Sequence, residues 1–398
     1  MKHLLKKYFG PSTLVTAAFV GPGTLTVCTV SGATHGYSLL WVLVFAILAT
    51  IVLQEMAARL GLITQTGLGE ALSSQINHPI SKLLSFLLVF LAIVIGNAAY
   101  QAGNITGASL GLSGVIGNSP LWPLLIGLCA FLILFIGKYH LIEQILITLV
   151  ILMSIVFLVT AIVAKPDISL ILSGLIPSVN EGNQLAILAL IGTTVVPYNL
   201  FLHASAVSKK WNRPHELKHL RKENAIAITF GGLISMAIVI TSAASLFGTD
   251  VRGMSEMATQ LQPLLGSWSK YFLALGLFAA GISSAITAPL AAAFAAKGIF
   301  GWTSESDLKF RAVWILVLLS GVILSVVGYR PIQVIQLAQI ANGLLLPIVV
   351  IFLLVIVNKK SLMNDYSNNL WQNLLGFAVI LVSVIISVRS FNSVFNFL

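Results

Sequence analysis

Stretches of apolar residues long enough to cross a lipid bilayer follow one another along almost the whole chain. Of its 398 residues, 58% are hydrophobic and only 9% carry a charge, whereas soluble globular proteins are about 25% charged. Each crossing of the hydrocarbon layer needs roughly 20 largely apolar residues in a helix. We therefore predict an all-α integral membrane protein that crosses the bilayer many times.

Hydropathy and the positions of the loops predict about eleven transmembrane helices. The predicted spans are 12–32, 39–58, 82–101, 120–137, 141–164, 185–207, 224–247, 270–296, 310–328, 335–357 and 370–388. The first span follows basic residues, as a secretory signal peptide does, but its apolar stretch is too long for one and is interrupted by Gly21-Pro22-Gly23. We therefore expect it to remain in the mature protein.

The basic residues predict the orientation of these spans. With the N-terminus inside the cell, 17 of the 22 Lys and Arg residues fall in cytoplasmic segments, as the positive-inside rule requires. This predicts a multi-pass plasma-membrane protein with a cytoplasmic N-terminus and an external C-terminus. The net charge of +10 follows from the same bias, so we expect the lipid bilayer as partner and no nucleic acid, which would need a basic stripe on a soluble face.

Two predicted helices are interrupted near their middles. Span one contains Gly21-Pro22-Gly23-Thr24 and span six contains Val196-Pro197-Tyr198-Asn199, and proline removes a backbone donor and clashes with the preceding turn. Two breaks five spans apart, in helices that enter from opposite faces, are typical of an inverted repeat. We expect residues 1–164 to form the first five-helix repeat, 185–357 the inverted second repeat, and 370–388 an accessory eleventh helix.

The breaks predict a binding site at the middle of the membrane. Unwound backbone at that depth must line a cavity or be buried in protein. Half-helix N-termini favour anions, and the opposing half-helix ends offer carbonyl oxygens to cations. From this alone the sign of the substrate's charge stays open.

Several of these stretches resemble the Nramp (SLC11) divalent-metal transporters, which have the leucine-transporter fold. The resemblance rests on Ser12 to Leu60 together with the stretch Gln54 to Gly61, on Ile191 to Ala204, and on Ala279 to Thr287 and Gln339 to Pro347. It implies an inverted 5+5 repeat with discontinuous helices 1 and 6.

The same resemblance implies that the metal ligands of the family are replaced here. The Asp and Asn of its Asp-Pro-Gly-Asn motif correspond to Gly21 and Thr24, its Met to Val196, a ligating carbonyl to Thr193, and its His to Tyr198. Desolvating a divalent cation without a negative ligand is costly, and Mn²⁺ sites usually contain carboxylate, imidazole or soft donors. We therefore expect no metal site of the family's kind.

A neutral pocket facing two helix N-termini favours a small organic carboxylate or amino-acid-like solute. The resemblance suggests 5-oxoproline, because genes for divergent Nramp-like proteins often lie beside those for 5-oxoprolinase subunits. The alternative is a divalent-cation (Mn²⁺ or Mg²⁺) transporter with altered coordination; a channel, a sensor or a non-transporting homologue forms a third class. The candidate substrate-binding residues are Gly21, Pro22, Gly23, Thr24, Gln101, Thr193, Val196, Tyr198, Asn199, Ser283, Gln339 and Asn342.

Energy coupling and catalysis have fewer candidates. His203 is the titratable side chain nearest the predicted pocket and could carry a proton, so we expect H⁺ symport, with Na⁺ on Ser283, Ser284 or Thr287 as the alternative. Glu55 and Arg59 lie four apart on one helix face. A local surface ion pair is the simpler interpretation of this spacing, and a gate at the cytoplasmic end is the alternative. No nucleophile, acid and base converge at membrane depth, so we expect neither an enzyme nor a cofactor.

Overall fold

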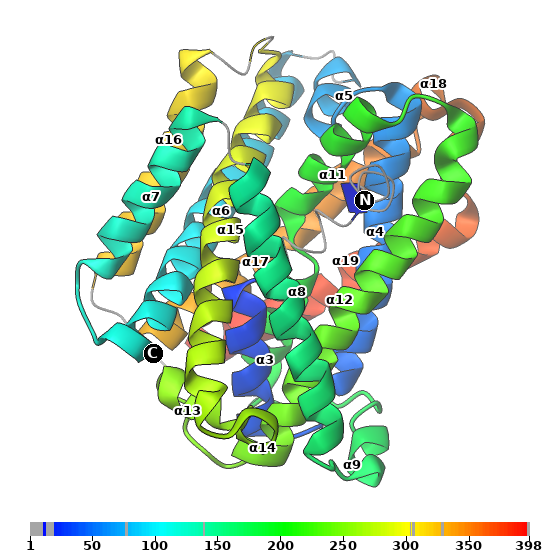
Figure 1. Ribbon diagram of the computed structural model, residues 1–398. Helices are drawn as coiled ribbons and strands as arrows, with labels where there is room; N and C mark the ends of the chain where they lie inside the picture. The colour runs from blue at the N-terminus through cyan, green and yellow to red at the C-terminus, as the bar shows by residue number, and fades with distance from the viewer. Residues whose placement is uncertain are drawn as a thin grey trace.

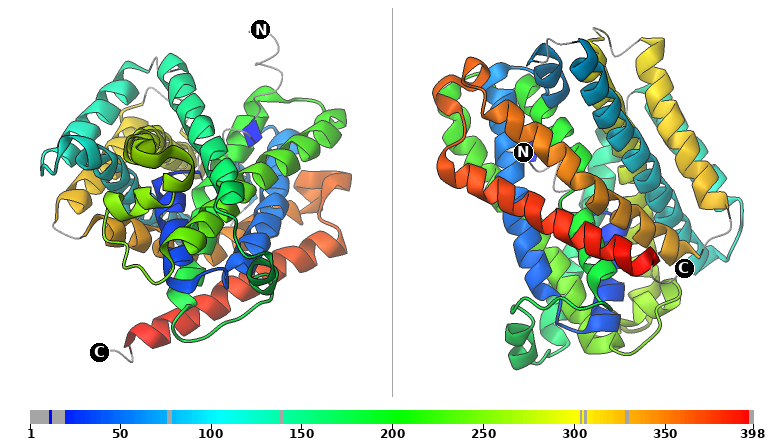
Figure 2. Two further views of the ribbon diagram at one scale, coloured as in Figure 1. Left: turned by 60° about the horizontal axis from the view of Figure 1, so that its bottom comes forward. Right: turned by 180° about the vertical axis from the view of Figure 1, so that it is seen from behind.

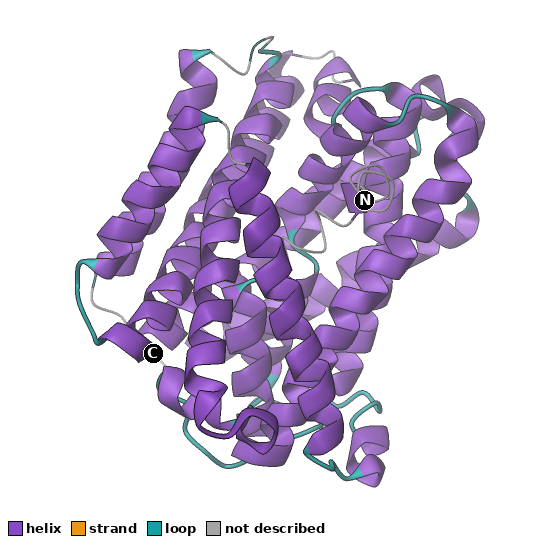
Figure 3. Ribbon diagram, in the orientation of Figure 1, coloured by secondary structure: helices purple, strands orange, loops and turns teal. Residues whose placement is uncertain are grey.

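The computed structural model describes residues 11–12, 20–75, 79–137, 140–302, 304, 307–327 and 330–395, and every regular element among them is a helix (Figure 3). Figure 1 shows these helices as one bundle that runs between two ends. The helices are α3 Pro22–His35, α4 Leu40–Thr64, α5 Leu68–Gln75, α6 Pro79–Ile116, α7 Trp122–Ile136, α8 His140–Val163, α9 Ile168–Ser173, α10 Gln184–Thr194, α11 Pro197–Lys210, α12 Leu217–Leu246, α13 Met254–Thr259, α14 Gln262–Leu265, α15 Ser269–Phe300, α16 Leu308–Val326, α17 Pro331–Val357, α18 Lys360–Met363 and α19 Leu370–Phe395, with short 3-10 turns at Pro214–Glu216, Gly266–Trp268 and Asn364–Tyr366.

The predicted all-α membrane architecture is confirmed. Eight helical segments within the described residues are long and apolar enough to cross a bilayer, and the count of eleven stays a prediction. Burial differs sharply among them: 89% of the apolar window of Gln184–Lys210 is buried in the protein, against 22% for Leu370–Arg389. The interrupted sixth span therefore lies at the centre of the bundle, while α19 lies obliquely across its outside (Figure 2).

Both predicted breaks are ends of helices in the structure. α3 begins at Pro22, and its N-cap Gly21 is extended with φ −110° and ψ −171°; residues 13–19, which precede it, lie outside the described residues. α10 ends at Thr194 and α11 begins at Pro197. From the middle of the bundle α3 runs toward the end that carries α9 and α14, and α11 toward the end that carries α5 and α18 (Figure 1).

The third span is longer than predicted because its second half packs against other helices of the bundle. We expected it to end at residue 101, but α6 continues to Ile116. Gln101 and Asn104 are fully buried, at 0% and 1% exposure. Gly107 and Gly111 let α6 lie directly against Pro22 of α3 and against the backbone of α15. A hydropathy criterion tuned to lipid contact therefore ends this helix too early.

Gly192 permits the closest approach between the sixth span and α17. A Cβ at this position would collide with the backbone carbonyl of Gln339 and lie 2.7 Å from the backbone nitrogen of Gly343. Neither obstacle is a movable side chain, so the two helices must separate if residue 192 is larger than glycine.

We predict that Gly192→Ala destabilises the protein by about 1–3 kcal/mol, the usual cost of overpacking a tight interface. Thermal unfolding of the purified protein in detergent, followed by tryptophan fluorescence, measures the change. Gly182→Ala is the matched control, because a Cβ there meets only the Asn180 side chain at 3.5 Å. Equal unfolding temperatures for the two variants would contradict the assignment of this contact.

Candidate functional site

The two breaks meet at the centre of the bundle through a pair of hydroxyl groups. Thr24 Oγ1, at the start of α3, lies 2.9 Å from Thr193 Oγ1, one residue before the end of α10, and both residues are completely buried. The Gln339 side chain of α17 packs directly on Gly23, where any Cβ would collide with it. The structure therefore brings Gly21 to Thr24, Thr193 and Gln339 to one junction of three helices.

Gln339 supplies this junction with a hydrogen-bond donor that the protein does not use. Its Oε1 accepts from Asn342 Nδ2 at 3.4 Å, but its Nε2 has no hydrogen-bond partner among the described residues. Gln339 and Asn342 are each only 1% exposed. A buried amide donor without a partner costs about 1–3 kcal/mol, so this group is poised for a ligand.

The start of α11 adds an aromatic contact and an acceptor. The ring of Tyr198 meets that of Tyr100 edge to face, with centroids 5.3 Å apart. Asn199 Oδ1 is buried without a hydrogen-bond partner. Val196 contributes extended backbone, and its carbonyl accepts from the backbone N–H of Asn199 at 3.1 Å.

One residue on α6 was missed by the sequence analysis. Tyr100, which directly precedes Gln101, packs against Tyr198. The available signal was the run of polar residues within an otherwise apolar span, from which we selected only Gln101.

The structure does not bring Gln101 or Ser283 into this junction. Gln101 Nε2 donates to the carbonyl of Ala285 at 3.0 Å, and its side chain packs on Gly321, so it faces α15 and α16. Ser283 is half-buried, and its carbonyl accepts from Thr287 at 3.2 Å. The fully packed hydroxyl is that of its neighbour Ser284, which is 2% exposed.

His203 lies on α11, beyond the break, with both ring nitrogens in hydrogen bonds. Nδ1 lies 2.9 Å from Gln54 Oε1, and Nε2 lies 3.3 Å from Ser12 Oγ. An amide oxygen can only accept, so Nδ1 donates. Nε2 accepts from the serine hydroxyl when the ring is neutral and donates to it when the ring is protonated, so both forms can keep these two hydrogen bonds. The proton-carrying role of His203 stays a prediction.

The junction itself offers hydroxyl, amide and carbonyl groups. Across the described residues, no three His, Cys, Asp or Glu side chains come together in a way that could hold a metal ion. Any cation at the breaks would therefore have neutral oxygen ligands.

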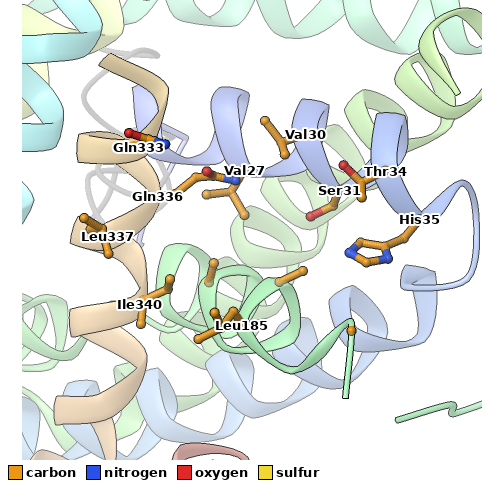
Figure 4. A pocket seen from close by; sticks show the side chains of 13 residues that line it. Val27, Val30, Ser31, Thr34, His35, Leu185, Gln333, Gln336, Leu337 and Ile340 are labelled. Atoms are coloured by element: carbon orange, nitrogen blue, oxygen red, sulfur yellow. The ribbon is translucent and has the colours of Figure 1, made fainter. Parts of the chain in front are cut away.

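An open cavity of about 450 Å³ lies between α3, α10 and α17, on the side of the junction toward which α3 runs. Figure 4 shows its walls, formed by Val27, Ser31 and Thr34 on α3, by Gln333 and Gln336 on α17, and by Leu185 on α10. On each wall the lining residues recur three or four positions apart. The junction residues do not line the cavity themselves, but Val27 and Ala189 lie one helical turn from Thr24 and Thr193. We call this cavity the vestibule, and His35 is the one titratable side chain in its lining.

Comparison with known proteins assigns the chain to a family. The model described as "Natural resistance-associated macrophage protein-like" (Nramp) matches residues 12–393. The chain belongs to the Nramp family. Among curated relatives, the "Divalent metal cation transporter MntH" of Staphylococcus saprophyticus is 27% identical, with 96% of this chain and 91% of that protein covered. The protein of that name from Listeria welshimeri is 26% identical, with 96% and 88% covered.

Solved structures support the same fold. The Eremococcus coleocola manganese transporter, in complex with an aromatic bis-isothiourea compound, superposes with a TM-score of 0.79 at 20% identity, covering 97% of this chain and 86% of that one. MhsT in complex with L-phenylalanine superposes at 0.56 and 15% identity, covering 96% and 98%. This Nramp protein therefore has the leucine-transporter fold and is a secondary transporter, not an enzyme.

We predict that the vestibule of this Nramp protein is open to the outside of the cell. In the variant Gln336→Cys, with the exposed Cys129 replaced by serine, a membrane-impermeant maleimide added to intact cells should label the new thiol. Cys28 on α3 is 0% exposed and serves as the internal control that stays unlabelled. Labelling that requires permeabilised cells would reverse the orientation predicted from the basic residues.

Proposed function

We propose that this Nramp-family chain transports a divalent metal cation by secondary active transport, and that the cation binds between the breaks at Gly21–Thr24 and Thr193–Asn199. The observation that carries the proposal is a junction of neutral oxygen atoms at the helix breaks of a chain from this family. The names of the curated relatives support this alternative better than the organic solute that the sequence led us to expect.

The buried acceptors of the site favour a cation over an empty pocket. Asn199 Oδ1 is buried without a partner among the described residues, and the hydroxyls of Thr24 and Thr193 lie 2.9 Å apart. Hard divalent cations prefer oxygen ligands, and Mg²⁺ in particular retains several waters when it binds. Such an ion can exchange part of its hydration shell for these oxygens, although neutral ligands select weakly among hard cations.

A small organic carboxylate is the second candidate, and a specific observation favours it. The Nε2 of Gln339, which has no partner among the described residues, is a donor, which a cation cannot use, and the positive N-terminal ends of α3 and α11 lie at the breaks. A carboxylate such as that of 5-oxoproline could accept from these groups. We keep H⁺ as the proposed coupling ion through His203, with Na⁺ as the alternative.

Thermal unfolding in the presence of candidate ligands separates the two substrates. A ligand at about 100 times its Kd stabilises the native state by roughly 2.7 kcal/mol. We expect Mn²⁺ or Mg²⁺ to raise the unfolding temperature, and 5-oxoproline, proline, glutamate and simple carboxylates to leave it unchanged. A shift with a carboxylate and none with metal ions would instead establish the second candidate.

One added charge at the break should act in opposite directions on the two substrates. We predict that Asn199→Asp strengthens metal binding about tenfold or more, because a carboxylate there offsets the cost of desolvating the ion. The same variant should weaken carboxylate binding by like-charge repulsion. The matched control is Asn369→Asp, which adds the same charge at an exposed position and should change neither affinity, as measured by titrating the thermal shift.

A further inference from the structure

A cluster of charged and amide groups lies at the end of the bundle opposite the vestibule. Arg59 of α4 is 1% exposed, so the pair it forms with Glu55 is not the surface ion pair that the sequence suggested. Its Nε and Nη2 donate to the Glu55 carboxylate at 3.0 and 3.2 Å. Nη2 also donates to Asn368 Oδ1 at 2.6 Å, and Nη1 donates to the carbonyl of Tyr366.

The same carboxylate joins two further helices. Arg221 of α12 donates to Glu55 Oε1 at 2.8 Å, and Gln372 of α19 lies 3.4 Å from Oε2. We call this group of residues the Arg59 cluster; its members are Glu55, Arg59, Arg221, Tyr366, Asn368 and Gln372. It fastens α4 to α12, to the turn before α19 and to α19 itself.

A small apolar cluster lies close to the Arg59 cluster in the chain and fills the space between α4, α11 and α12. Its members are Ala58, Leu62, Val207, Leu217 and Leu220. Val207 is 0% exposed, and it lies one helical turn beyond His203 on the half-helix that starts at the sixth-span break. This packing therefore fills the route from the candidate site toward that end.

α4 and α11 are in direct contact next to the Arg59 cluster. Gly61 of α4 lies directly against the backbone of Ala204 on α11, where a Cβ would collide with it, and Gln54 of α4 is bonded to His203. A restraint on α4 is therefore a restraint on α11, which must move if the site is to open at this end.

We propose that Arg59 and Glu55 are positioning residues for transport, which hold the end opposite the vestibule closed while the vestibule is open. The proposal rests on the chain being a transporter and not on which substrate it carries. Removing one partner of a buried ion pair leaves the other uncompensated, so its loss shifts the population toward the state in which this end is open.

Cysteine accessibility at both ends of the protein tests the proposal. In a Cys129→Ser background, Val207→Cys reports on the closed end and Gln336→Cys on the vestibule, each labelled with a hydrophilic maleimide in purified protein. With Glu55→Gln or Arg59→Lys added, we expect labelling of Val207→Cys to become about tenfold faster and labelling of Gln336→Cys to become slower, as a two-state shift requires.

The paired readout separates a shift of state from loss of folding. Faster labelling at both positions would mean that the cluster only stabilises the fold, and unchanged labelling of Val207→Cys would mean that it does not hold this end closed; either result overturns the proposal. Asp250→Asn is the matched control, since it breaks the exposed Arg252–Asp250 pair, with side chains 70% and 71% exposed, and should alter neither rate. Because no substrate is added, the outcome is independent of the proposed metal.

Discussion

Unpaired backbone groups cannot be left in the middle of a membrane, and the rest of this structure depends on how two helix breaks meet that constraint. Each break frees amide and carbonyl groups that lipid cannot satisfy. Around the sixth-span break one partner comes from a neighbouring helix, since Thr50 of α4 donates to the carbonyl of Thr194 at 3.3 Å. Another comes from the span itself, where the Val195 N–H donates to the carbonyl of Ile191 at 2.7 Å. The interrupted span is buried in the bundle because only protein can supply such partners.

The absence of charged side chains at the two breaks follows from the same constraint. A carboxylate in such a buried place would need a cation or several donors to offset its desolvation, and the breaks here are lined by hydroxyl and amide groups instead. That choice leaves individual polar atoms without partners, among them Gln339 Nε2 and Asn199 Oδ1. The open donor belongs to α17 and packs on Gly23 at the first break, and the open acceptor lies at the start of α11 at the second. The site is therefore compatible with either sign of charge, and the nature of the ligand depends on which of the two groups it uses.

The sequence was sufficient to place the breaks, because proline and glycine act locally on the backbone. The resemblance to the family added Thr24, Thr193, Gln339 and Asn342 as candidates, and the structure brings Thr24, Thr193 and Gln339 together, with Asn342 bonded to Gln339. The sequence was not sufficient for residues on continuous helices, where neighbours point about 100° apart. Gln101 faces α15 while Tyr100, one residue earlier, meets Tyr198. Only packing decides which of two adjacent polar residues faces the site.

The two ends of the molecule differ in what closes them, and this asymmetry has a physical origin. At the vestibule end, the α3, α10 and α17 walls are lined by apolar side chains, neutral polar side chains and His35 around a cavity of about 450 Å³, and no pair of opposite charges lies among these lining residues. At the other end, a buried guanidinium, two amide side chains and an apolar cluster must separate together. Because Gly61 and Gln54 tie α4 to α11, those contacts act on the half-helix that begins at the break. A ligand that draws the two breaks together would therefore move α11, and α11 would transmit this movement to the Arg59 cluster through α4. The occupancy of the site would in this way affect the closed end, although the ligand does not touch the Arg59 cluster.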